Sequence, residues 1–239
     1  PANLRSLSCR NNQLSSLPPL PDSLQNLGCA NNELSELPTL PAGLTNLGCN
    51  TNQLSSLPTL PASLTNLNCS NNQLTSLPTL PNLTSLTCKT NLLGSLPSLP
   101  ASLTNLRCDT NQLSSLPLLP ASLTFLRCDN NQLVSLPPLP ANLRFLFSRN
   151  NSALFCLPTL PDGLMTLRTD STKITCIPNQ PANVSMFPVL PLCTALNADF
   201  SFVVDSLTVA FTNLTNDNHQ TIGYSWAFGD GATSTLLSP

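Results

Sequence analysis

Cysteine is the residue type with the clearest chemical potential in this 239-residue sequence, which has ten cysteines and one histidine. Seven cysteines recur every 19 or 20 residues, as Cys9, Cys29, Cys49, Cys69, Cys88, Cys108 and Cys128. Zinc sites use closely spaced ligands such as C-x-x-C or a nearby histidine, and these seven have neither. On stacked strands they would lie ~4.8 Å apart, whereas disulfides bring Cβ atoms to roughly 3.5–4.5 Å. We therefore expect them to be small buried apolar residues.

The other three cysteines, Cys156, Cys176 and Cys193, depart from this spacing. Cys156 and Cys176 each precede a hydrophobic residue and a proline, and Cys193 follows the last recognisable repeat. A cysteine beyond a stack of repeats can fold back onto its final coil, which favours a capping disulfide between Cys176 and Cys193. Pairing of Cys156 with Cys176 is the alternative. Either disulfide requires an oxidising compartment.

Catalytic chemistry has little support in the sequence. The single histidine, His219, lies in a polar stretch between residues 213 and 220. There is no Ser-His-Asp set, phosphate-binding loop, metal-binding cluster or convincing pair of carboxylates. We expect a protein that is not an enzyme and that uses neither a cofactor nor a metal.

Composition excludes several classes of partner. Charged residues make up 8% of the chain and the formal net charge is -2, which argues against a nucleic-acid surface. No apolar run approaches the roughly 20 residues that span a bilayer, so we expect no membrane span. The sequence starts in the middle of one pattern and stops inside another, which indicates part of a longer polypeptide.

A tandem repeat must position the cysteine column. Residues 61–80 read PASLTNLNCSNNQLTSLPTL, and five further segments match without a gap: 1–20, 21–40, 41–60, 100–119 and 120–139. Residues 81–99 lack one position, residues 140–160 have one extra, and residues 161–180 are a worn ninth copy. A single copy cannot bury its leucines, so stacking must form the core.

Each copy contains a short alternating segment, such as Leu67-x-Cys69, that predicts a strand with its apolar residues inward. The prolines at 78 and 81 exclude helix on the outer side and favour extended, polyproline-like backbone. A buried asparagine begins each turn and needs backbone partners in adjacent coils. This structural ladder comprises Asn12, Asn32, Asn52, Asn72, Asn91, Asn111, Asn131 and Asn151.

The consensus L-x-x-L-x-C-x-x-N-x-L-x-x-L-P-x-L-P resembles the leucine-rich-repeat signature, with cysteine at its third apolar position. The Leu-Pro-x-Leu-Pro ending and the 20-residue length are most similar to the short bacterial type, found in secreted effectors and bacterial surface proteins. The resemblance implies a mainly β solenoid of about nine coils, with short parallel strands and a polyproline-like convex side. We assign residues 1–190 to this solenoid, including a C-terminal cap.

Outward positions of the strands would form the concave face, and they change character along the chain. The first half is small and neutral, whereas the second half carries aromatic and charged residues, the types enriched in binding hot spots. We expect an aromatic–arginine patch made of Phe125, Phe145, Phe147, Arg107, Arg127, Arg149, Arg168, Asp109 and Asp129. Three alternatives stay open: the rings pack against a cap, the charges merely pair along the ladder, or the patch is a crystal or fibre contact.

The repeat stops near residue 190. Residues 198–211 alternate as two paired strands would, with Asp205-Ser206 as the turn. The later run Tyr224-Ser-Trp-Ala-Phe-Gly-Asp-Gly231 resembles the start of a PKD-type domain, an immunoglobulin-like β-sandwich common in extracellular proteins. The resemblance implies that residues 197–239 are the incomplete N-terminal part of such a domain.

Together these features indicate a non-catalytic bacterial surface or secreted protein. Adhesion through the concave face to a protein or glycan is the favoured role. An architectural spacer or subunit of an extracellular assembly is one alternative, and a secreted effector acting by protein–protein interaction is another. The PKD-like segment favours an extracellular location.

Overall fold

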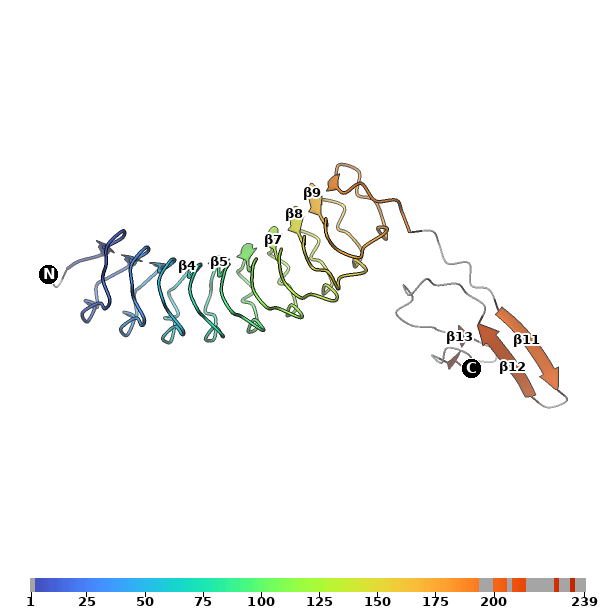
Figure 1. The fold of residues 1–239 in the computed structure, drawn as a ribbon, viewed down its shortest axis with the longest axis horizontal. Coiled ribbons are helices and arrows are strands. Elements are labelled where there is room, and N and C mark those ends of the chain that lie inside the picture. The colour runs from blue at the N-terminus through green and yellow to red at the C-terminus, as the bar shows by residue number, and fades with distance from the viewer. Residues whose placement is uncertain (1–2, 194–199, 206–207, 214–225, 228–232, 235–239) are drawn as a thin grey trace. The chain divides into compact units, whose positions relative to one another are not determined.

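The computed structural model describes residues 3–193, 200–205, 208–213, 226–227 and 233–234. The chain divides into two compact units, Pro1–Leu192 and Cys193–Pro239. The first unit is a stack of coils, each of which contributes one short strand to the same side of the stack (Figure 1). No helix occurs among the described residues.

The strands of the first unit form one parallel sheet in chain order. Each has three residues: β1 (Ser6–Ser8), β2 (Asn26–Gly28), β3 (Asn46–Gly48), β4 (Asn66–Asn68), β5 (Ser85–Thr87), β6 (Asn105–Arg107), β7 (Phe125–Arg127), β8 (Phe145–Phe147), β9 (Thr166–Arg168) and β10 (Ser185–Phe187). The register joins equivalent repeat positions throughout, as Leu67 with Leu86. The solenoid with one strand per coil is confirmed, and β10 adds a rung beyond the ninth repeat.

Leucine and cysteine fill the interior. The middle residue of each strand points inward, and from β2 to β9 it is at most 2% exposed. Six of the seven column cysteines, Cys29 to Cys128, are fully buried, and Cys9 is partly exposed. Together with the leucines they form one continuous hydrophobic cluster. Each coil therefore depends on its neighbours for burial, as expected for a solenoid.

The asparagine ladder links consecutive coils through backbone groups. In a typical rung, the Asn131 amide donates to the carbonyl oxygens of Cys108 in the preceding coil and Cys128 in its own coil, both at 3.1 Å. Its Oδ1 accepts the N–H of Leu113 from the preceding coil at 3.0 Å. The same pattern holds from Asn32 to Asn151. Through these contacts each ladder asparagine joins its own coil to the preceding one.

The residue before each ladder asparagine, and before Thr172 at the equivalent position of the ninth coil, has left-handed backbone with φ between 53° and 59°. This column reads Asn11, Asn31, Thr51, Asn71, Thr90, Thr110, Asn130, Asn150 and Ser171. Asparagine tolerates this conformation, whereas a β-branched residue adopts it rarely. The three threonine rungs are therefore held in place by the surrounding ladder rather than by their own preference.

Changes in repeat length are absorbed outside the strands. The missing residue of coil five falls between Pro81 and Leu83, where the Leu83 N–H still bonds to the Pro81 carbonyl at 2.8 Å. The extra residue of coil eight lies between Asn151 and Leu154, where the Leu154 N–H closes a turn on the Asn151 carbonyl at 3.0 Å. The strands on either side stay in register.

The second unit contains two antiparallel pairs of strands: β11 (Phe200–Asp205) with β12 (Thr208–Asn213), and β13 (Trp226–Ala227) with β14 (Thr233–Ser234). The hairpin agrees with the sequence pattern, but Asp205 pairs with Thr208. The connection is therefore residues 206–207, one position later than the expected Asp205-Ser206 turn. His219, Tyr224 and Phe228–Gly231 lie outside the described residues.

Candidate functional site

The first and third residues of each strand point away from the core and form a surface that we call the sheet face. In β6 to β9 these side chains are half-buried, whereas the residue between them is buried, because side chains alternate along a strand. Parallel pairing without offset then stacks equivalent positions of adjacent coils. Strands β6 to β9 bring the predicted aromatic–arginine patch together on the sheet face.

Three phenylalanines lie at the centre of this patch. The ring of Phe125 is 5.9 Å from that of Phe145 and 5.5 Å from that of Phe147, measured between centroids. The ring planes are tilted by 40° and 36°, respectively. All three rings are half-buried, so no cap covers them within the described residues. The rings therefore present a cluster of tilted apolar surfaces that is partly open to solvent.

Asp129 is the electrostatic hub beside the rings. It is only 2% exposed, and its Oδ2 accepts from Arg127 Nε at 3.0 Å and Arg149 Nη2 at 2.9 Å. Its Oδ1 accepts the backbone N–H of Arg149 at 2.8 Å. The hydrogen bond to Asp129 is the main cause that raises the pKa of Arg149. Asp129 is therefore a buried structural carboxylate, although the sequence pattern had placed it on the open surface.

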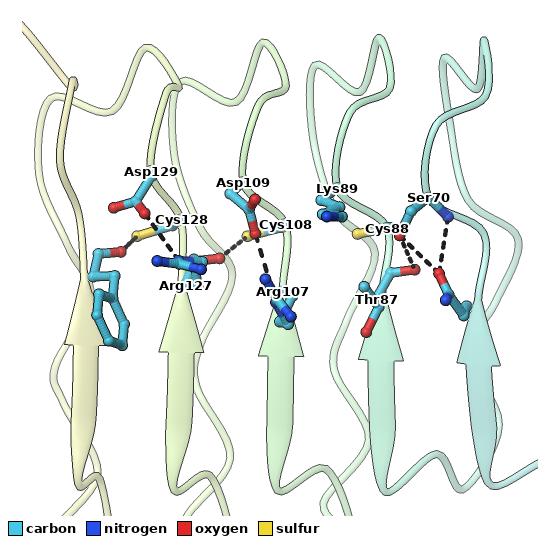
Figure 2. Close-up of polar contacts among 12 residues, drawn as sticks. Ser70, Thr87, Cys88, Lys89, Arg107, Cys108, Asp109, Arg127, Cys128 and Asp129 are labelled. Carbon is cyan, nitrogen blue, oxygen red and sulfur yellow. Dashed lines mark hydrogen bonds and ion pairs between the residues drawn. The ribbon is translucent and has the colours of Figure 1, made fainter. Parts of the chain in front are cut away.

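The guanidinium of Arg127 also covers one face of Phe147, at 4.6 Å from the ring centroid. Such stacking is a cation–π contact, and it holds the Arg127 side chain close to the sheet. Figure 2 shows Arg127 pointing toward Asp129, next to the equivalent pair Arg107 and Asp109 on the preceding coil.

Arg107 and Asp109 make fewer hydrogen bonds than the equivalent residues Arg127 and Asp129. Arg107 Nε and Asp109 Oδ1 lie 3.9 Å apart, and neither of these buried atoms has a hydrogen-bond partner in the described part of the chain. Asp109 lacks the second arginine that Asp129 has, because the equivalent residue on the next coil is Asp129 itself rather than an arginine. Arg168 is engaged elsewhere, donating to the carbonyl oxygens of Leu167 and Ser185 at 3.0 Å.

Phe187 extends the patch, and the repeat pattern did not reveal it. It is the third residue of β10, pairs with Arg168 across the sheet, and is 59% exposed. The coil-start motif Pro181-Ala-Asn-Val184 was the available signal. The inward residue Met186 lies two positions after Val184, whereas in the other coils the inward strand residue lies three positions after the corresponding leucine. The motif therefore does not align with the repeat.

The other half of the sheet face has a different character. Strands β1 to β5 line a shallow hollow of about 410 Å³ with serine, asparagine, threonine and glycine residues, the leucines between them and Arg10. Arg10 lies across Gly28, where an added Cβ would come within 2.6 Å of its Nε. This half has no aromatic residue, so it lacks the apolar anchor that the patch provides.

Comparisons with known structures agree with this geometry. The leucine-rich-repeat domain of a Shigella effector is 31% identical to this chain, with a TM-score of 0.53. The match covers 72% of this chain and 71% of that domain. The chain belongs to the bacterial leucine-rich-repeat proteins. YopM from Yersinia enterocolitica is 34% identical to this leucine-rich-repeat protein, with a TM-score of 0.66.

The match to YopM covers 80% of this chain and 47% of YopM, so the chain spans about half the length of that protein. No protein-family model and no curated protein matches the chain.

The column cysteines of this leucine-rich-repeat protein are poor nucleophiles. Burial raises the pKa of the Cys29 thiol to about 12 and raises that of Cys49, Cys69, Cys88 and Cys108 well above the usual value. Some thiols donate to strand carbonyls of the next coil, as Cys128 does to Phe147 at 3.4 Å (Figure 2). The described ranges contain no group of three or more His, Cys, Asp or Glu residues placed to hold a metal ion.

Cys176 and Cys193 are disulfide-bonded, and the other eight cysteines are free thiols. The alternative pairing of Cys156 with Cys176 is therefore not formed. Within the part of the chain that the structure describes, no helix has the length and apolar character of a membrane span.

Proposed function

We propose that this leucine-rich-repeat protein is a non-catalytic binding module that recognises a protein or glycan through the aromatic–arginine patch. The observation that carries the proposal is the half-exposed cluster of Phe125, Phe145 and Phe147 beside cationic side chains. Exposed aromatic and arginine residues dominate binding energy at interfaces. The Shigella relative is described as an effector domain, a class consistent with recognition of a partner.

The proposed setting is extracellular, as a bacterial surface or secreted protein with a role in adhesion. A disulfide at Cys176 and Cys193 supports this setting, because disulfides persist mainly in oxidising compartments. We further propose that residues 197–239 begin a PKD-like domain, which the hairpin β11–β12 is compatible with. On this proposal the chain is part of a longer polypeptide that displays the solenoid.

The hollow over β1 to β5 favours a second function, that of an architectural spacer. Apart from Arg10, its outward side chains are small and neutral and offer no apolar anchor, and the coils that carry it differ little from one another. In this case the first coils set a distance, and the patch is only a packing or assembly surface.

Replacing Phe125, Phe145 and Phe147 with serine distinguishes the two functions. The matched control replaces three exposed apolar residues elsewhere, Leu92, Leu118 and Val134, which are 47%, 80% and 48% exposed. We expect the phenylalanine variant to lose binding to cultured cells and glycan arrays, while the control binds as the parent does. Circular dichroism would verify that both stay folded. Unchanged adhesion of the phenylalanine variant would favour the spacer.

A further inference from the structure

The aromatic–arginine patch has unused hydrogen-bond donors but few unused acceptors. Both oxygens of Asp129 accept hydrogen bonds from Arg127 and Arg149, and the residue is 2% exposed. Asp129 therefore has no free acceptor for a ligand. Asp109 Oδ1 is buried beneath the surface. A ligand approaching the rings therefore meets Arg107 and Arg127, whose carboxylate partners are occupied or largely buried. The half-buried Asp170 acts electrostatically on Arg149.

Three arginines keep donors available for a ligand. Arg107 makes no side-chain hydrogen bond in the described residues, although a third of its side chain is exposed. Arg127 uses only Nε on Asp129, and Arg149 uses only Nη2. Guanidinium groups bind carboxylates through paired N–H donors, so such arginines select an anion.

The ring geometry indicates what lies between the charges. Sugars stack on open, flat aromatic faces, but the Phe125 ring is tilted by 36° to 40° against its neighbours. One face of Phe147 is occupied by the Arg127 guanidinium. Tilted rings, one of them with a face already occupied, favour contact with a compact apolar side chain over stacking of a flat sugar ring.

We propose that the patch recognises a protein segment in which an apolar side chain is flanked by carboxylates. The apolar group packs against the rings of Phe125, Phe145 and Phe147, and the carboxylates pair with Arg107 and Arg127. Phe187, 59% exposed on β10, lengthens the apolar contact toward the C-terminal end of the sheet. This inference rests on the proposed binding function and adds the chemical class of the partner.

A random-peptide display library tests the class of partner directly. Selection uses the whole chain as bait, and the Phe125→Ser, Phe145→Ser, Phe147→Ser variant removes peptides that bind elsewhere. We expect enriched peptides to place Asp or Glu beside Leu, Phe or Trp. Enriched peptides that depend on the patch but are neutral or basic would overturn the inference while leaving the binding function intact.

One enriched peptide is then titrated calorimetrically against single variants. Arg107→Gln is expected to weaken its binding about tenfold, the loss of a charge-assisted hydrogen bond. Arg5→Gln removes the same charge from an exposed site on the first coil and should leave affinity unchanged. Equal effects of the two variants would overturn the assigned role of Arg107. Failure of every peptide, together with patch-dependent binding on a glycan array, would overturn the protein partner and retain the binding function. Absence of any patch-dependent ligand would remove the binding function as well.

Discussion

Replacing Asn131 with alanine should destabilise the solenoid by about 2–4 kcal/mol. Asn131 is 8% exposed and makes four hydrogen bonds, three as donor and one as acceptor. The carbonyl oxygens of Cys108 and Cys128 each keep a second ladder amide, from Asn111 and Asn151. The Leu113 N–H has no second acceptor, and a buried donor left without a partner costs about 1–3 kcal/mol. The rest of the loss comes from the three weakened carbonyl contacts.

The neighbouring Gln132 provides the matched control, because it carries an amide on the same coil but is exposed. Its backbone N–H bonds to the Leu113 carbonyl, and that contact survives substitution. Gln132→Ala should therefore change the free energy of unfolding by no more than about 0.5 kcal/mol. Urea denaturation followed by far-ultraviolet circular dichroism measures both variants, and the slope of the transition shows whether the coils still unfold together.

An aspartate at the same position sharpens the test. Asn131→Asp keeps the acceptor for Leu113 but sets a carboxylate against three carbonyl oxygens within 3.1 Å. It should cost at least as much as alanine at neutral pH and recover part of the loss in acid, where the carboxyl can donate. If Asn131→Ala and Gln132→Ala had equal effects, the ladder would not hold the coils together.

Three further predictions concern single columns of the solenoid. Thr110→Asn should stabilise the chain by about 1 kcal/mol, since φ is 59° there and asparagine tolerates that backbone better, and a lowered urea midpoint would contradict this. The free energy of unfolding should fall as pH rises above about 9, because burial raises the pKa of the Cys29 thiol in the folded state to about 12. The stability that this protonated thiol contributes is complete below its pKa in the unfolded chain and is lost as pH approaches its pKa in the folded chain. Urea midpoints from pH 7 to 10 measure this, and a Cys29→Ala variant should show a weaker decline. Asp129→Asn should cost about 3 kcal/mol, because it breaks a buried pair, and clearly more than Asp109→Asn in the same thermal or urea melts.

The repeat made the solenoid predictable because every coil must bury the same apolar positions and satisfy the same asparagine. Leu67 and Cys69 must turn inward, and an asparagine such as Asn72 must find backbone partners, so spacing alone gave the sheet, the core and the ladder. The left-handed residue before each asparagine was not predicted. Its column mixes Asn, Thr and Ser, and only the backbone trace shows that they share one conformation.

In the candidate site, the residue spacing anticipated which rings lie side by side but not how the charged side chains connect. Stacking of equivalent positions was sufficient to bring Phe125, Phe145 and Phe147 together. The burial of Asp129 depends on Arg149 reaching back across one coil, a matter of side-chain direction that residue spacing does not encode. The repeat spacing did not predict the position of Phe187, because one residue is missing from the repeat just before β10.

The absorption of length changes outside the strands has a consequence for how such a chain can vary over generations. Near-identical repeats invite unequal recombination, and a whole coil gained or lost leaves every remaining strand in register. Coils five and eight have a missing and an extra residue between strands, so recombination that adds or removes a single residue there also preserves the fold. The molecule can thus be lengthened or shortened in steps of ~4.8 Å, and the distance between its first coil and its patch becomes a heritable quantity that changes by whole coils.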